Sequence, residues 1–116
     1  MGPPPDPAEP AGLLDISAED RGSVRVLTLS GEIDLSTADA LRRAADDHGG
    51  PLVLDVGEVS FVDSTGVRTL MEMSADRAVA LHAVPTALRR MLELTQLTER
   101  FPEIEGLEQH HLDALG

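Results

Sequence analysis

The sequence contains no cysteine, no tryptophan and no tyrosine, and only two of its 116 residues are phenylalanine. The absence of cysteine excludes disulfides, thiol catalysis and zinc sites built on thiolates. The absence of tryptophan and tyrosine removes the usual platforms on which nucleic-acid bases stack. The core must therefore be built from leucine, valine, isoleucine and alanine.

Positive charge is also scarce. Nine basic residues stand against 21 acidic ones, which gives a net charge of −12. This charge repels the phosphates of nucleic acids and of anionic membrane surfaces, so neither is expected as a partner. No apolar run approaches the roughly 20 residues that a bilayer-spanning helix needs. The first residues lack the basic and apolar regions of a secretory signal, and the sequence predicts a soluble cytoplasmic protein.

The length and composition predict one domain with one modest core, which we place at residues 13–106. Residues 1–12 are rich in proline and poor in large apolar groups, and they are predicted to form a disordered arm. Residues 107–116 are expected to be a C-terminal tail that could form a short helix.

Within this domain, short apolar runs alternate with helical patterns. Strands are expected at residues 13–17, 24–29, 51–56, 78–84 and 101–106. Helices are expected after Ser36, whose partner Asp39 completes a helix-start signature, and again after Ser64 and Pro85. Strands that alternate with helices predict parallel crossovers and an α/β fold in which helices cover the sheet.

The stretch SFVDSTGV, residues 60–67, places an acid and two hydroxyls where a strand ends and a helix begins. Such a cluster fits catalysis, a phosphorylation site, or a helix capped by Asp63, Ser64 or Thr65. A helix start also accommodates a phosphate, because free N–H groups and the helix dipole face it. A hydroxyl at this position could therefore act as a switch.

Catalysis finds no support in the residue pattern. An extra residue between Asp63 and Gly66 breaks the Asp–Ser/Thr–Gly triplet of aspartic proteases. No G-x-S-x-G turn is present, and His82 is expected to pack within a strand rather than to act as a base. The adjacent His110 and His111 diverge on a helix and cannot share a metal ion. We therefore expect no catalytic residue, no metal site and no cofactor.

Three stretches, VRVLTLSGEIDLSTADALRRA, PLVLDVGEVSFVDSTGVRTLM and AVPTALRRMLELTQL, together resemble the STAS domain of anti-sigma factor antagonists. The resemblance covers about residues 13–105, and its most specific part is the core from Asp55 to Val67. It implies a small mixed, mostly parallel sheet of four to five strands with helices packed mainly on one side. It also implies that the protein is not an enzyme.

Members of this family bind an anti-sigma factor that is itself a serine kinase, and so release a sigma factor. The kinase then phosphorylates a serine of the antagonist and ends the binding. That serine corresponds to Ser64, with Thr65 as the competing acceptor, and the expected partner-binding residues are Asp34, Asp63, Ser64, Thr65 and Gly66. A phosphatase is a candidate second partner, and the chain is expected to be a monomer or a weak dimer.

The alternative is a non-switching STAS interaction module of a signalling scaffold or lipid-transport complex, in which Ser64 only caps a helix. The sequence also departs from the family in three places, of which one is the Pro-rich arm and the His-containing tail, which have no counterpart in the family. The segment between Ser64 and the strand at 78–84 is several residues shorter, which predicts a clipped second helix. Gln96 stands where relatives often have the glycine of a left-handed helix cap, at a cost of up to about 1 kcal/mol.

Overall fold

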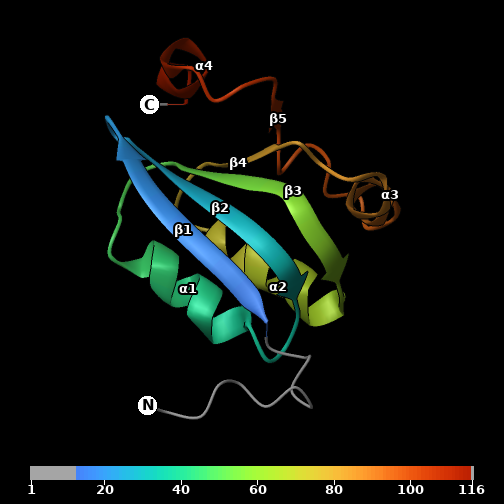
Figure 1. The fold of residues 1–116 in the computed structure, drawn as a ribbon. Coiled ribbons are helices and arrows are strands. Elements are labelled where there is room, and N and C mark those ends of the chain that lie inside the picture. Colours follow the sequence, from blue (N-terminus) through green and yellow to red (C-terminus); the bar gives the residue numbers. More distant parts are fainter. Residues whose placement is uncertain (1–12, 116) are drawn as a thin grey trace, which may run out of the picture.

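The structure is a computed structural model that describes residues 13–115. The arm predicted for residues 1–12 lies outside the described residues. In the described part, five strands form one sheet in the order β1-β2-β3-β4-β5, as Figure 1 shows. The strands are β1 (Leu14–Arg21), β2 (Val24–Ile33), β3 (Leu52–Val62), β4 (Val79–His82) and β5 (Glu103–Ile104). Only β1 and β2 pair antiparallel, so the predicted mixed, mostly parallel sheet is confirmed.

Four helices accompany this sheet in the described residues: α1 (Ala38–Asp46), α2 (Ser64–Met73), α3 (Thr86–Leu94) and α4 (Gln109–Asp113). Figure 1 shows α1 and α2 beneath the same face of the sheet. The short connection expected after Ser64 still leaves α2 ten residues, or just under three turns. Within residues 13–115, none of the helices has the length and apolar character required to cross a membrane.

The core is divided between the two faces of the sheet because side chains alternate along each strand. Leu27 and Leu29 of β2 belong to the larger cluster, to which α1, α2 and α3 also contribute buried side chains. Val24 and Val26 point to the opposite face and form a smaller cluster with Leu112 of α4. The prediction that helices pack mainly on one side is therefore confirmed, and α4 covers part of the other face.

Both central strands are longer than the sequence indicated. β2 continues past residue 29 to Ile33, and β3 continues past residue 56 to Val62. The register between them shifts twice, between Thr28 and Ser30 and between Gly31 and Glu32. Each irregularity interrupts the alternation of apolar and polar residues, so the pattern hides the second half of each strand.

Helix α3 ends in the left-handed cap that the sequence predicts. Gln96 has a φ of 61°, and its N–H donates to the carbonyl of Glu93 (3.1 Å). The N–H of Leu97 donates to the carbonyl of Leu92 (2.8 Å), which completes the pair of bonds of a Schellman motif. The prediction that a glutamine occupies the glycine position of this cap is confirmed.

Candidate functional site

The candidate site lies at the edge of the sheet where β2 and β3 end side by side. Ile33 pairs with Val62 in parallel register, so the residues that follow, Asp34 and Asp63, begin two neighbouring loops. The N–H of Asp63 donates to the carbonyl of Ile33 (3.3 Å) and ties the second loop to the first strand. Through this pairing the structure brings Asp34 close to the segment Asp63–Gly66, as the predicted site requires.

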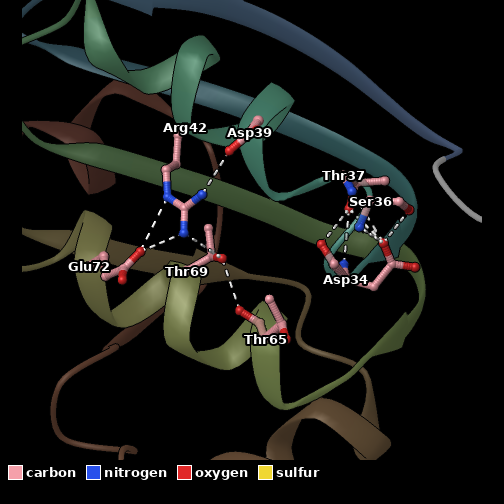
Figure 2. A network of polar contacts seen from close by, with 8 residues as sticks. All are labelled: Asp34, Ser36, Thr37, Asp39, Arg42, Thr65, Thr69 and Glu72. Carbon is pink, nitrogen blue, oxygen red and sulfur yellow. Dashed lines mark hydrogen bonds and ion pairs between the residues drawn. The ribbon is translucent and has the colours of Figure 1, made fainter.

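The side chain of Asp34 accepts the hydrogen bonds that hold the first loop, residues 34–37, together. Its Oδ1 accepts hydrogen bonds from the N–H of Ser36 (2.9 Å), the hydroxyl of Ser36 (2.7 Å) and the N–H of Thr37 (3.2 Å), as Figure 2 shows. The Thr37 hydroxyl donates to the carbonyl of Glu32 (2.8 Å) and accepts from the N–H of Asp34 (2.9 Å). Asp34 is only 9% exposed. The hydroxyl of Ser36, followed by the backbone N–H groups, holds the pKa of Asp34 below its usual value.

The prediction that Ser36 starts the first helix is wrong, because Ser36 belongs to this loop. α1 begins at Ala38, after Thr37, and no side chain caps it. The Ser36 hydroxyl is bonded to Asp34 instead. Asp39, the expected partner in the helix-start signature, forms an ion pair with Arg42 (3.0 Å).

Asp63 caps α2. It has the extended backbone of a capping residue, and its Oδ1 accepts from the N–H of Gly66 (2.8 Å). The sequence left Asp63, Ser64 and Thr65 open as caps, and Asp63 is the residue that caps α2. Gly66 permits this arrangement, because a Cβ there would collide with the carbonyl of Ile33 and lie 2.9 Å from Cγ1 of Val62.

Ser64 is the first residue of α2, and its side chain is exposed. Its hydroxyl makes no hydrogen bond to any residue between 13 and 115. Thr65 is half-buried, and its carbonyl accepts from the hydroxyl of Thr69 (2.9 Å). Ser64 is therefore the more accessible of the two predicted acceptors, and it does not cap the helix.

Arg42 fixes α1 against α2 behind these loops. Its guanidinium pairs with Glu72 of α2 (2.6 Å) and also reaches the hydroxyl of Thr69 (3.5 Å), as Figure 2 shows. The same group contacts Asp39 on its own helix. These contacts set the relative position of the two helices that follow the Asp34 and Asp63 loops.

Ser64 shares a surface groove with apolar side chains. A groove between α2 and α3 is lined by Ser64, Val67, Arg68, Met71, Met91 and Thr95. Large apolar residues are exposed in the adjoining elements: Leu35 in the first loop (77%), Phe61 at the end of β3 (51%) and Leu94 of α3 (79%). This surface could not be predicted from the sequence, because an apolar residue in a pattern is normally assigned to the core.

No metal centre is formed in the part of the chain that the structure describes, where no three His, Asp or Glu side chains converge on one point. His82 is half-buried, and its Nδ1 lies 3.1 Å from the carbonyl of Ile104. His82 therefore packs within the sheet at the end of β4, next to β5, as predicted. Ser64 lies elsewhere, at the start of α2.

Known proteins share both the sequence pattern and this fold. The family model described as "Mlab, STAS domain" matches residues 16–107. The anti-sigma-F factor antagonist RsfB of Mycobacterium tuberculosis is 37% identical over 65 residues, a match that spans 53% of this chain and 53% of that protein. The chain thus aligns with about half the length of this curated relative.

Solved structures extend the likeness over nearly the whole chain. An anti-sigma factor antagonist from Mycobacterium paratuberculosis has a TM-score of 0.71 and 31% identity, over 90% of this chain and 95% of that chain. The phosphorylated form of the Bacillus cell fate determinant SpoIIAA has a TM-score of 0.63 over 88% of this chain and 100% of that chain. Its 18% identity shows a likeness of fold alone. From the family model and the mycobacterial relatives, the chain belongs to the STAS-domain family of anti-sigma factor antagonists.

Proposed function

We propose that this chain is an anti-sigma factor antagonist that binds an anti-sigma factor kinase, releases a sigma factor, and is switched off by phosphorylation of Ser64. The observation that carries the proposal is the state of Ser64 itself. Its side chain is exposed at the start of α2, while the capping role is taken by Asp63. A hydroxyl that supports no local structure is available to a kinase.

The surface around Ser64 suits a protein partner. Exposed apolar side chains such as Leu35, Phe61 and Leu94 are typical of residues that become buried in an interface. Asp34 contributes to this surface by holding the loop that presents Leu35. Asp63 and Gly66 shape the turn that presents Ser64.

The proposed switch is electrostatic. A phosphate adds up to two negative charges to a chain whose net charge is already −12. Phosphorylation would place this charge among apolar side chains that the partner must cover, so binding weakens by desolvation and by repulsion of acidic groups. The fold should survive, because the first turn of a helix favours a nearby anion.

The chemistry of phosphoryl transfer belongs to the kinase. The Ser64 hydroxyl loses its proton and bonds to the γ-phosphorus of ATP, and ADP leaves. The chain contributes the acceptor and no catalytic group, so we propose no enzymatic activity of its own. Because its targets regulate transcription, we place this function in the cytoplasm, with a phosphatase as the partner that restores the hydroxyl.

The test is phosphorylation by an anti-sigma factor with a serine kinase domain from the same organism. The chain is incubated with this kinase and Mg-ATP, and mass spectrometry locates the phosphate. We expect modification of Ser64, none in Ser64→Ala, and normal modification in the control variant Ser36→Ala, whose hydroxyl is bonded to Asp34. Phosphate on Thr65 alone would move the acceptor by one residue.

Binding measurements separate the switch from the alternative, a non-switching STAS interaction module. We expect Ser64→Ala to bind the kinase as the unaltered chain does, and Ser64→Glu to bind at least tenfold more weakly because it carries part of the phosphate's charge. Equal binding by all three proteins, together with the absence of phosphorylation, would favour the non-switching module.

A further inference from the structure

Arg68 is the charged residue that shares a groove with Ser64. It lies four residues after Ser64 on α2, and both side chains line the groove between α2 and α3. Arg68 is exposed, and it forms no ion pair with any residue in the described range 13–115. By contrast, Arg25, Arg42 and Arg89 are each paired with an acidic side chain.

We propose that Arg68 holds the phosphate once Ser64 is modified, so that the two side chains form an ion pair at the mouth of this groove. The inference rests on the proposed phosphorylation of Ser64 and adds the residue that receives the phosphate. The pair would fix the phosphate where an apolar side chain of the partner would otherwise enter. Phosphorylation would then fill part of the groove as well as add negative charge to it.

The spacing favours this pair. Residues four apart on a helix lie on the same face, and the arrangement with the negative group nearer the N-terminus is the more favourable one. The guanidinium presents two parallel N–H groups, which match two oxygens of a phosphate. Ser64 and Arg68 satisfy both the spacing and the order.

The groups that face Arg68 leave it available. Glu72 lies four residues further along α2, but its carboxylate is already paired with Arg42 (2.6 Å). Asp63 accepts a hydrogen bond from the N–H of Gly66 and belongs to the preceding turn. Across the groove, α3 and its C-cap contribute Met91 and Thr95, which carry no charge.

The experiment uses the full chain with phosphoserine inserted at position 64 during translation, so that no kinase is needed. A phosphorus NMR titration then measures the second pKa of the phosphate, which is ordinarily about 6. We expect this pKa to be higher in Arg68→Gln than in the parent by roughly a few tenths of a pH unit, because the dianion loses its partner. The difference should shrink in 1 M salt, where charges are strongly screened.

The matched control is Arg43→Gln, which removes the same charge from an exposed arginine on α1. We expect its phosphate to titrate as in the parent. Arg68→Lys keeps the charge without the planar fork, and its pKa should fall between those of the parent and Arg68→Gln. Identical titrations in the parent, Arg68→Gln and Arg43→Gln would overturn the ion pair.

This result can be told apart from a failure of the proposed function. Insertion of phosphoserine by translation tests the ion pair whether or not a kinase modifies the chain. If the kinase leaves Ser64 unmodified, the switch fails while the titration still reports on the pair. If the kinase modifies Ser64 but Arg68→Gln titrates like the parent, the switch holds and the role of Arg68 fails.

Discussion

Two turns of this molecule resemble each other in composition but differ in how their hydroxyls are bonded. Residues 34–37 (DLST) and residues 63–66 (DSTG) each follow a parallel strand and precede a helix, and each begins with an aspartate followed by hydroxyls. In the first turn the hydroxyls are bonded internally to Asp34 and the backbone. In the second turn Asp63 bonds the backbone N–H of residue 66, and the hydroxyl of Ser64 is left exposed.

The difference arises from the third residue after each aspartate. Thr37 is 2% exposed, and its hydroxyl closes the first turn around the buried carboxylate. Gly66 has no side chain, so the start of α2 approaches the end of β2 and its N–H meets Asp63. The residue at this position thus distinguishes a turn that is closed by its own hydroxyls from one that leaves the Ser64 hydroxyl exposed.

The largest effect is expected from Gly66→Ala. The added Cβ would collide with the backbone of Ile33, which cannot move without disturbing the pairing of β2 and β3. We expect a loss of about 3 kcal/mol in the free energy of unfolding, measured by urea denaturation. The control is Gly49→Ala, where a Cβ would meet nothing within 4 Å. Equal stability of the two variants would refute the close approach of α2 to β2.

Removal of the carboxylate that closes the first turn should have the next largest effect. Asp34→Ala would remove the acceptor of the N–H and hydroxyl of Ser36, and it would leave the N–H of the buried Thr37 with only the backbone carbonyl of residue 34. We expect a loss of about 2 kcal/mol, since hydrogen bonds to a charged group are among the stronger ones. Asp34→Asn retains an oxygen acceptor and should lose less. A loss below about 0.5 kcal/mol in Asp34→Ala would show that the loop closes without this residue.

The same carboxylate predicts a dependence of stability on pH. Hydrogen bonds from Ser36 and Thr37 lower the pKa of Asp34 in the folded chain. The stabilisation is therefore fully present above the ordinary aspartate pKa of about 3.9, and it is lost as the pH falls through the lower folded value. Denaturation between pH 5 and pH 2 should show a shallower decline for Asp34→Asn than for the parent. Parallel declines would mean that Asp34 contributes no such dependence.

Much of the fold could be predicted from the sequence, because the strands carry dense apolar runs and the helices carry regular apolar spacing. The extra lengths of β2 and β3 could not, since the register shifts near Gly31 interrupt the alternation. Those lengths shape the candidate site, because they carry Asp34 and Asp63 to one edge of the sheet. Pairing between distant strands, rather than any local pattern, determines this juxtaposition.

Part of the geometry around Ser64 could also be predicted from the sequence. The motif placed Ser64 at a helix start, but it left Asp63, Ser64 and Thr65 equal as caps. The choice depends on the approach of residue 66 to Ile33, which no local pattern reveals. Exposure of Leu35 was hidden for a similar reason, because only the folded loop shows which apolar side chains the core leaves out.

A smaller effect is expected from Asp63→Ala, which removes the cap of α2. The N–H of the buried Gly66 would lose its acceptor, but Asp63 itself is half-buried, so water can enter where its carboxylate stood. We expect a loss of about 1 kcal/mol, and a smaller loss in Asp63→Asn, since asparagine is also a good cap. Thermal denaturation would measure both variants. A parent-like melting temperature for Asp63→Ala would show that another residue can take over the cap.

The smallest effect, and the one that divides the two turns most sharply, is expected from Ser64→Ala. Because Asp63 caps α2 and the Ser64 hydroxyl has no partner among residues 13–115, its loss should change the free energy of unfolding by less than about 0.5 kcal/mol. Ser36→Ala is the matched control in the other turn, where the hydroxyl bonds Asp34 (2.7 Å) and its loss should cost about 1 kcal/mol. Urea denaturation of both variants under the same conditions measures the difference. A cost for Ser64→Ala that equals or exceeds that for Ser36→Ala would mean that the Ser64 hydroxyl supports the fold. The two turns would then share one role, and phosphorylation of Ser64 would have to disrupt the start of α2 rather than leave it in place.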